Sequence, residues 1–320
     1  MDYVTLGRTG LKVSVAGLGC GGFSRLGLGS GKTEAEAVAV VRRALELGVT
    51  LFDTAAAYGT EGVVGQGLKG VPRDSVVITT KASITREEER IPAAEVVASL
   101  ENSLRLLQTD HIDVFQLHGV PPAHYDHAVN VIAPALKREQ EKGTFRHLGL
   151  TEGAVRDPHA EMLARATRDD LWDTVMLAFH MMHQNAREAV LPQTQAKRIG
   201  TLLMFAVRNI FARPERVGEA MRELAAAGQV PQSLADLDEP LGFLIHAGGA
   251  DSLTDAAYRY ARHEPGIDVV LFGTGNLHHI ETNIASLLKP PLPAADRARL
   301  AELFGHLRGV GLEGARPAKP

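Results

Sequence analysis

The sequence lacks the features that mark secreted, membrane-spanning and nucleic-acid-binding proteins. It has one cysteine, Cys20, in 320 residues, which excludes a disulfide framework and favours a reducing compartment. No apolar run approaches the roughly 18 residues of a membrane span, and the opening residues MDYVTLGRTG contain no signal-peptide core. The formal net charge of -4 leaves no basic field for nucleic acid or anionic lipid. We therefore expect a soluble, cytoplasmic protein.

Apolar strand-like runs alternate with helix-like segments through nearly the whole chain. Strands that are buried on both faces have near-continuous apolar sequences. Eight such runs occur, at residues 13–19, 49–54, 75–82, 112–118, 145–151, 173–179, 200–206 and 267–273. This alternation predicts a single (β/α)8 barrel over residues 1–320, with a loose tail at 309–320. A doubly wound open sheet is the alternative, although about six strands usually suffice there.

Three of the intervening segments allow more specific predictions. Thr33 and Glu36 have the spacing of a capping box, so a helix should begin there. Residues 229–250 are long for a loop, and we expect them to be partly helical or functional. A helix over 92–107 should bury one face. That face consists of Val97, Leu100, Leu104 and Leu107.

The stretch from Gly17 to Glu36 contains parts of two nucleotide-binding fingerprints, and both are incomplete. A P-loop needs a glycine where Leu26 stands, which argues against a P-loop NTPase. The dinucleotide fingerprint of Gly17, Gly19 and Gly22 should open a helix directly, but FSRLGLGSGK intervenes. We predict instead a flexible glycine-rich loop at the mouth of the barrel.

Three successive predicted strands end in polar residues, where barrel enzymes build their active sites. These residues are Asp53, Lys81 and His118, and Tyr58 follows Asp53 in the next loop. We expect Lys81 to lower the pKa of Tyr58 by up to about three units before burial opposes it, which would make Tyr58 a general acid. Asp53 would hold Lys81 charged, and His118 would donate a hydrogen bond to a substrate oxygen. Singly, each could be structural; together they favour catalysis.

With these residues in place, the sequence resembles the aldo-keto reductases. The resemblance spans essentially the whole chain and is carried by LGRTGLKVS (6–14), FDTAAAYG (52–59), TTK (79–81) and DVFQLHG (113–119). It implies a barrel closed at its N-terminal end by a hairpin near residues 3–14. It also implies NADPH-dependent reduction of an aldehyde or ketone to an alcohol, with Tyr58 as proton donor, Lys81 and Asp53 as its supports, and His118 orienting the carbonyl.

The resemblance also implies a set of cofactor contacts at the barrel mouth. They are Gly21, Gly22, Asp53, Thr151, Glu152, Met176, Phe205, Ala206, Val207, Arg208, Gly273, Thr274, Gly275, His279 and Asn283. Several depart from the family pattern. Thr151 and Glu152 replace a Ser-Asn pair, Met176 replaces a glutamine, and His279 replaces the arginine that clasps the 2′-phosphate. A neutral histidine lacks the charge and forked donors of arginine, so NADPH is expected with NADH or dual use as the alternative.

The remaining features add no second chemistry. His180 and His183 could present two imidazoles from a helix, but no third ligand is spaced to match, and no metal is expected. Cys20 is expected to be inert. The expected partner is a small carbonyl substrate, without nucleic acid or membrane, and the sequence gives no oligomeric state. The alternative function is a cofactor-binding sensor or regulatory subunit with little turnover. The altered carboxamide positions permit it, whereas the complete set of four polar residues at the strand ends argues against it.

Overall fold

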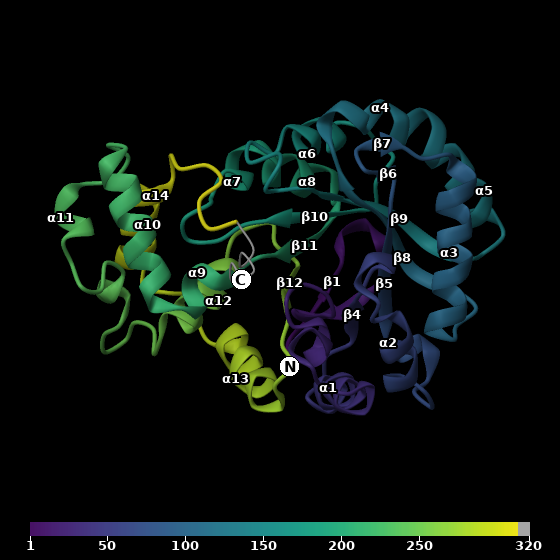
Figure 1. The fold of residues 1–320 in the computed structure, drawn as a ribbon, viewed down its shortest axis with the longest axis horizontal. Coiled ribbons are helices and arrows are strands. Elements are labelled where there is room, and N and C mark those ends of the chain that lie inside the picture. The colour runs from purple at the N-terminus through teal and green to yellow at the C-terminus, as the bar shows by residue number, and fades with distance from the viewer. Residues whose placement is uncertain (313–320) are drawn as a thin grey trace.

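The computed structural model describes residues 1–312, apart from the side chain of Pro214, and its central feature is a closed parallel barrel (Figure 1). The strands pair in the order β10-β11-β12-β3-β4-β5-β8-β9. The eight predicted runs supply them. Their bounds are β3 (Ala16–Gly19), β4 (Leu51–Asp53), β5 (Val77–Ser83), β8 (Ile112–Val120), β9 (Phe145–Glu152), β10 (Thr174–Ala178), β11 (Gly200–Met204) and β12 (Val269–Phe272).

A short hairpin closes the N-terminal end of the barrel. β1 (Tyr3–Thr5) pairs antiparallel with β2 (Lys12–Ser14), which confirms the hairpin implied near residues 3–14. The first predicted strand, 13–19, is therefore divided between β2 and β3. Leu6 and Val13 join a cluster inside the barrel. Its other buried members are Leu51, Val77, Val114, Met176, Leu202 and Val269.

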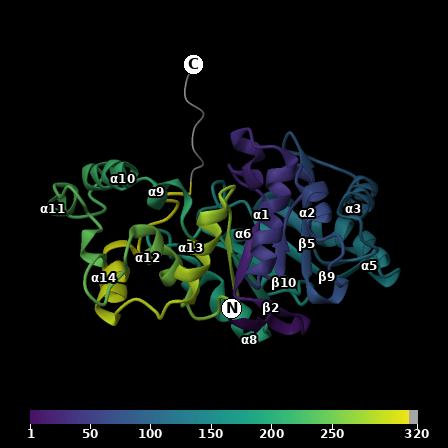
Figure 2. The same ribbon diagram turned by 90° about the horizontal axis from the view of Figure 1, so that it is seen from below.

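Helices surround the barrel and follow its strands (Figures 1 and 2). They are α1 (Glu34–Glu46), α2 (Glu61–Gly67), α3 (Ala93–Leu107), α4 (Tyr125–His127), α5 (Ala133–Glu141), α6 (Glu161–Ala166), α7 (Ala186–Ala189), α8 (Leu191–Lys197), α12 (Leu253–Arg262) and α13 (Leu277–Leu288). A small hairpin of β6 (Thr85–Arg86) and β7 (Glu89–Arg90) follows β5.

The start of α1 agrees with the sequence prediction, whereas the buried face of α3 differs from it. The capping box of α1 is present: Thr33 Oγ1 accepts the Glu36 N–H at 3.3 Å, and the Thr33 N–H donates to Glu36 Oε2 at 2.9 Å. The predicted buried face of α3 was displaced, because Val97 and Leu104 are only partly buried at its edge. The fully buried residues of α3 are Val96, Leu100, Ser103 and Leu107.

Between β11 and β12 the chain leaves the barrel and forms a lobe to one side (Figures 1 and 2). The lobe contains α9 (Arg208–Ala212), α10 (Pro214–Ala226), α11 (Gln232–Ala235) and the later α14 (Ala294–Phe304). Residues 229–250 are thus partly helical, with α11 and a 3-10 turn at Gly242–Leu244. The predicted loose tail differs at its start, because Leu312 is buried, and its remainder, 313–320, lies outside the described residues.

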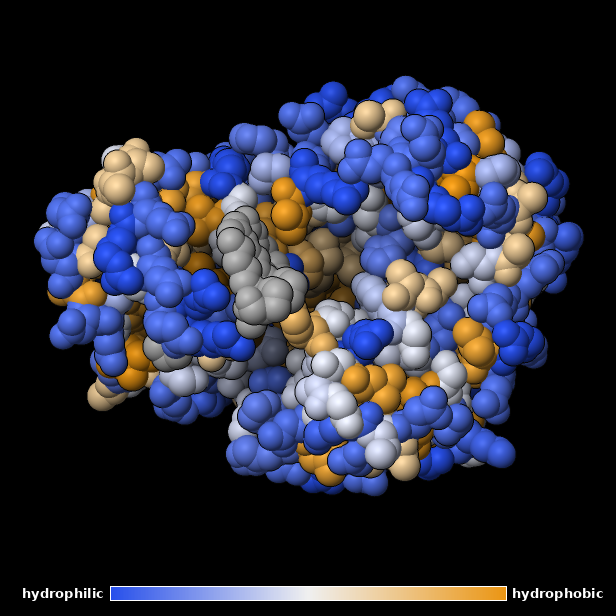
Figure 3. Space-filling model, viewed as in Figure 1, coloured by the Kyte–Doolittle hydropathy of each residue, from blue (hydrophilic) through white to orange (hydrophobic). Residues whose placement is uncertain are grey.

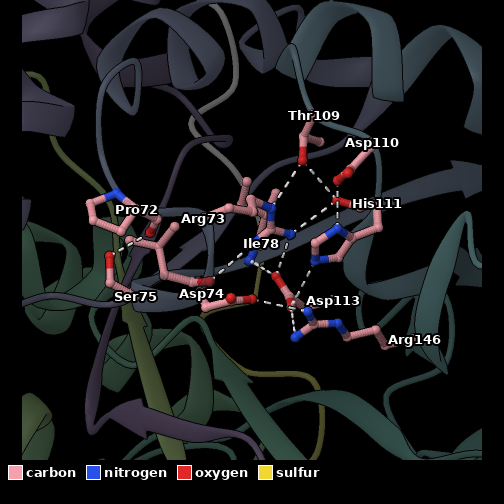
Figure 4. Close-up of polar contacts among 11 residues, drawn as sticks. Pro72, Arg73, Asp74, Ser75, Ile78, Thr109, Asp110, His111, Asp113 and Arg146 are labelled. Carbon is pink, nitrogen blue, oxygen red and sulfur yellow. Dashed lines mark hydrogen bonds and ion pairs between the residues drawn. The ribbon is translucent and has the colours of Figure 1, made fainter.

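The N-terminal ends of β5 and β8 are joined by a buried carboxylate (Figure 4). Asp113 Oδ2 accepts hydrogen bonds from Arg73 Nη2 at 2.6 Å and from the backbone N–H of Ile78 at 2.8 Å. Arg146 Nη1 lies 3.2 Å from the other oxygen. The cluster therefore fastens neighbouring strands at the end of the barrel away from the polar strand ends. No helix in the described chain has both the length and the apolar character needed to cross a membrane.

Candidate active site

Asp53 and Lys81 form a buried ion pair at the C-terminal ends of neighbouring strands. Asp53 is the last residue of β4, and Lys81 Nζ contacts both of its carboxylate oxygens at 2.8 Å. Lys81 Nζ also donates to the carbonyl of Thr54 at 2.7 Å, and Thr79 Oγ1 donates to Asp53 at 2.5 Å. The strands place these groups, because β4 and β5 pair in parallel with Asp53 opposite Thr79. The ammonium and the carboxylate are thus held by each other and by hydrogen bonds to neighbouring residues.

Tyr58 and His118 lie beside this pair. Tyr58 ends a short 3-10 turn after β4, and its hydroxyl is 3.3 Å from Nε2 of His118. Lys81 Nζ lies 5.1 Å from the centre of the Tyr58 ring. A Cβ on Gly21 would lie 2.4 Å from that ring, so only glycine leaves room for it. The structure therefore brings together all four residues proposed for catalysis.

The pKa of Tyr58 depends on burial as well as on the charges of Lys81 and Asp53. Burial raises the pKa of Tyr58; Lys81 lowers it, but Asp53 raises it again, so the net shift is upward. The predicted lowering by Lys81 is therefore present, but desolvation and the carboxylate together outweigh it in the free protein. Burial, with the field of Lys81, lowers the pKa of His118 to about 3, so the imidazole is neutral at physiological pH.

Lys81 remains charged although it is fully buried. Burial alone would lower the pKa of Lys81, but Asp53 reverses this and leaves it raised. The site therefore contains a neutral phenol, a neutral imidazole and a fixed ammonium. Such a set can give a proton to a developing alkoxide and stabilise the phenolate that remains.

A cavity of about 630 Å³ opens beside Tyr58, where the barrel meets the lobe. Figure 3 shows a hollow in this face with hydrophobic side chains on its wall. The predicted site residues in its lining are Gly21, Gly22, Asp53, Tyr58, Met176, Phe205, Ala206, Val207, Arg208, Gly273, Thr274, His279 and Asn283. Those outside the lining are Lys81, His118, Thr151, Glu152 and Gly275.

Part of the cavity wall was missed by sequence reasoning. This part consists of residues of α12 and α13, together with Ser252, which precedes α12, and Met204 at the end of β11. Ser252 caps α12 by accepting the Asp255 N–H at 3.1 Å, a spacing that could have been found in the sequence. That α12 faces the barrel mouth depends on the lobe and has no local signal. The missed residues include Ser252, Thr254, Asp255, Tyr258, Met204, Thr282 and Ser286.

Comparison with known proteins places this geometry in a family. Residues 17–304 match the aldo/keto reductase family. The chain belongs to that family. L-galactose dehydrogenase from Arabidopsis thaliana is 28% identical over 317 residues, covering 97% of this chain and 95% of that protein. Aldo-keto reductase YhdN from Bacillus subtilis (strain 168) is 26% identical over 289 residues, covering 85% of each.

Solved aldo-keto reductase structures share the fold. The holo form of aldo-keto reductase AKR11C1 from Bacillus halodurans superposes with a TM-score of 0.71 at 22% identity, over 95% of this chain and 96% of that one. The aldo-keto reductase Tm1743 in complex with the inhibitor epalrestat gives a TM-score of 0.69 at 19% identity, over 95% and 100%. The closed barrel with its outer helices is therefore the family fold.

In this aldo-keto reductase, Arg208 is a half-buried cation in the cavity wall. Its guanidinium lies 3.8 Å from the centre of the Phe205 ring and donates to the carbonyl of Leu312 from Nε and Nη2, at 3.2 and 2.5 Å. Both Phe205 and Arg208 have left-handed backbones, with φ of 71° and 48°. Strain of this kind concentrates at functional sites. Arg208 has no carboxylate partner among the described residues, which leaves its charge available to an anion.

The glycine-rich segment packs against the turn before α13. A Cβ on Gly275 would lie 2.4 Å from the Cα of Gly27, and Lys32 Nζ donates to the Gly275 carbonyl at 2.8 Å. The predicted glycine-rich segment borders the cavity through Gly21 and Gly22. Its continuation, Arg25–Ser30, consists of short 3-10 turns separated by a kink at Leu26 and Gly27. Gly275 therefore supports the cavity wall from behind.

His180 and His183, which could have presented two imidazoles from a helix, do not lie on one. His180 and His183 are paired in an isolated antiparallel bridge, and their ring centres are 5.9 Å apart. Burial lowers the pKa of both imidazoles. Among residues 1–312 no group of three or more metal-ligating side chains of His, Cys, Asp or Glu occurs.

Proposed function

We propose that this protein transfers hydride between a nicotinamide dinucleotide and a carbonyl–alcohol pair, with Tyr58 as the acid–base group. The observation that carries this proposal is the Tyr58 hydroxyl, 3.3 Å from neutral His118 and beside the buried Lys81–Asp53 pair. Tyr58 also lines a cavity whose volume is typical of ligand sites, about 300–1,000 Å³. The Tyr58 side chain thus provides a proton donor that borders the cavity.

Each polar residue has a separate task in the proposed reaction. Tyr58 gives its proton to the oxygen of a carbonyl during reduction and takes it back during alcohol oxidation. Lys81 stabilises the phenolate left behind, which partly offsets the rise in pKa that burial imposes on Tyr58. Asp53 and the Thr54 carbonyl fix the position of Lys81. Neutral His118 donates a hydrogen bond to the substrate oxygen from Nε2.

The cavity residues fit a dinucleotide. When bound, the nicotinamide supplies or accepts the hydride. Arg208 would bind the diphosphate, because it is the one lysine or arginine in the described cavity lining and has no acidic partner. Thr274, His279 and Asn283 line the part of the cavity at α13 and would hold the adenosine end. NADPH is the proposed cofactor, with NADH as the alternative, since His279 lacks the forked donors of arginine.

The substrate is proposed as a small aldehyde or ketone, or the corresponding alcohol. A relative at 28% identity is a sugar dehydrogenase, so aldoses such as L-galactose belong in the test beside simple aldehydes. A cytoplasmic location stays a prediction from the single cysteine.

Turnover tests the proposal in both directions. Wild-type protein is assayed with aldehydes and reduced cofactor, and with aldoses and oxidised cofactor, next to Tyr58→Phe. We expect turnover by the wild type and a loss of about 10²- to 10⁴-fold in the variant, the contribution that general acid–base catalysis makes. Full activity of Tyr58→Phe would contradict the role of Tyr58. Tight cofactor binding by a wild type that turns over nothing would favour the sensor alternative.

A further inference from the structure

Glu152 is a buried acid at the barrel mouth that has no basic partner. It ends β9, and only 4% of the residue is exposed. Its Oε1 accepts a hydrogen bond from the backbone N–H of Ala178 at 2.5 Å, while Oε2 has no hydrogen-bond partner among the described residues. Within that part of the chain the charged group whose field acts on it is Asp157, another acid. A carboxyl group in this setting is costly if it serves structure alone.

The electrostatics keep Glu152 protonated near neutral pH. Burial raises the pKa of its carboxyl to about 8; the Ala178 N–H opposes this rise and Asp157 adds to it. With Oε1 engaged as an acceptor, a proton on Oε2 makes that oxygen a hydrogen-bond donor. The same side chain can therefore act as a neutral donor or as a negative acceptor within an accessible pH range.

The position of Glu152 relates it to the cavity. Its partner Ala178 packs in a small apolar cluster with Met204 and Phe205, and both of these line the cavity. Met176, two residues before Ala178 on β10, lines it as well. The carboxyl group thus lies behind the wall formed by the ends of β10 and β11, outside the cavity lining itself. The proposed hydride transfer requires the nicotinamide ring to lie in the cavity that this wall shares with Tyr58.

We propose that Glu152 discriminates between the two redox states of the bound nicotinamide. As a neutral acid it accommodates the uncharged reduced ring, and as a carboxylate it favours the positively charged oxidised ring. The inference rests on the proposed function. Because both groups are desolvated, their attraction is screened little. Binding of oxidised cofactor should therefore release a proton from Glu152, and the preference for the oxidised form should grow as the pH rises.

The other titratable groups around the site do not produce this signature between about pH 6.5 and 9. Tyr58 and Lys81 have raised pKa values and stay protonated. On the side of β8, the pKa of His118 is lowered to about 3, and beyond β10 that of His180 is lowered by burial, so both stay neutral. Arg208 stays charged, because even half-buried an arginine keeps its proton in this range.

Asp157 and His279 differ from Glu152 in their contacts and in their positions. Asp157 accepts the N–H groups of Glu161 and Met162 at 2.9 Å, which fixes it at the start of α6. His279 lies on α13, where the adenosine end is common to both redox states. Any influence of His279 therefore cancels when the affinities for the oxidised and reduced forms are expressed as a ratio.

The test measures dissociation constants for NAD⁺ and NADH, and for NADP⁺ and NADPH, at about pH 6.5 and 9. Reduced forms are followed by their fluorescence, and oxidised forms by competition. Wild type is compared with Glu152→Gln, whose amide imitates the protonated acid at both pH values. The matched control is Glu61→Gln, since Glu61 is also buried but bonds Thr80 Oγ1 at 2.6 Å, outside the cavity lining.

In the wild type and in Glu61→Gln, the preference for the oxidised form should increase on the order of tenfold across this range. In Glu152→Gln the ratio should stay constant, and the proton released on NAD⁺ binding to wild type in weak buffer should disappear. A pH-independent ratio in the wild type, or an unchanged ratio profile in a folded Glu152→Gln, overturns the inference alone. If no dinucleotide binds to wild type, the proposed function fails and this inference with it.

Discussion

Asp53 and Asp113 are both buried carboxylates with basic partners, but they lie at opposite ends of the barrel. Asp113, near the start of β8, is held by arginines whose side chains are 23% and 42% exposed, and by the N–H of Ile78. Asp53, at the end of β4, is held by a lysine that is completely buried. The first cluster joins strands and borders solvent. The second adjoins a phenol, an imidazole and a cavity.

The two ends of this barrel carry different tasks, stability at one and the proposed chemistry at the other. A salt bridge at the N-terminal end fastens strands without needing a ligand, whereas a fully desolvated pair at the C-terminal end influences the groups that line the mouth. Burial of Lys81 is costly, and Asp53 is needed to keep it charged. We therefore expect changes at the two carboxylate clusters to have different consequences, and the following variants are designed to test this.

The largest effect is expected from Lys81→Met at the mouth. Without the ammonium, burial and Asp53 both raise the pKa of Tyr58 unopposed, so turnover should fall by about 10³-fold. Stability should also fall by about 3–5 kcal/mol, because Asp53 is left as an unpaired buried charge. Steady-state kinetics and denaturant unfolding measure the two losses. The double variant Asp53→Asn/Lys81→Met should regain stability without regaining turnover; recovery of turnover would contradict the role of Lys81.

Asp113→Ala should affect the other end of the barrel and leave chemistry intact. It removes the acceptor for the buried Ile78 N–H and one partner of Arg73, for an expected loss of about 2–4 kcal/mol in the free energy of unfolding. Turnover per folded molecule should stay within about twofold of wild type. If kcat fell by orders of magnitude in the folded variant, the separation between the two ends would not hold.

Arg208→Met tests the cavity wall away from the ion pair. Loss of the half-buried guanidinium should weaken dinucleotide binding about tenfold, which is the effect of losing one charge-assisted contact of about 1.4 kcal/mol. Fluorescence titration with reduced cofactor measures this. Arg208→Lys is the control that keeps the charge, and it should lose less. Unchanged affinity in Arg208→Met would mean that the guanidinium does not bind the dinucleotide and serves only its contacts with Phe205 and Leu312.

Glu152→Gln supplies the smallest effect, because this third buried acid has no cation to lose. Its folded pKa is raised by burial to about 8 from 4.5, so the folded protein holds a proton that the unfolded chain releases. Wild-type stability should therefore decrease as the pH rises from about 4.5 to 8, and Glu152→Gln should lack this component. We expect the variant to melt at a higher temperature than the wild type at high pH, relative to their difference at low pH. A constant difference would contradict the raised pKa.

The sequence predicted the barrel well because its signals were local. Each strand is an apolar run, and the Thr33–Glu36 capping box needs only its own residues. The α3 face was displaced because Ser103, a polar residue that bonds the Ser99 carbonyl, is buried where the hydrophobic pattern offered no signal. The α12 wall was missed because its direction depends on the lobe.

The candidate site was predicted less evenly than the fold. Strand ends identified Asp53, Lys81 and His118, since parallel pairing brings such residues to one rim. The direction of the Tyr58 pKa shift could not be predicted, because it depends on how deeply the ring is buried relative to Lys81. The burial of the Glu152 carboxyl and its hydrogen bond from the Ala178 N–H likewise depend on the fold and could not be predicted from the sequence.

We propose that the cavity beside Tyr58 is a nicotinamide site. The most direct test is a titration of the purified wild-type protein with NADPH and NADH, followed by nicotinamide fluorescence. It requires no knowledge of the substrate and addresses the cavity that joins Tyr58 to α13. We predict saturable binding of at least one cofactor, and the ratio of the two affinities would show whether His279 still favours the 2′-phosphate. Failure of both to bind would contradict the claim that this cavity is a nicotinamide site.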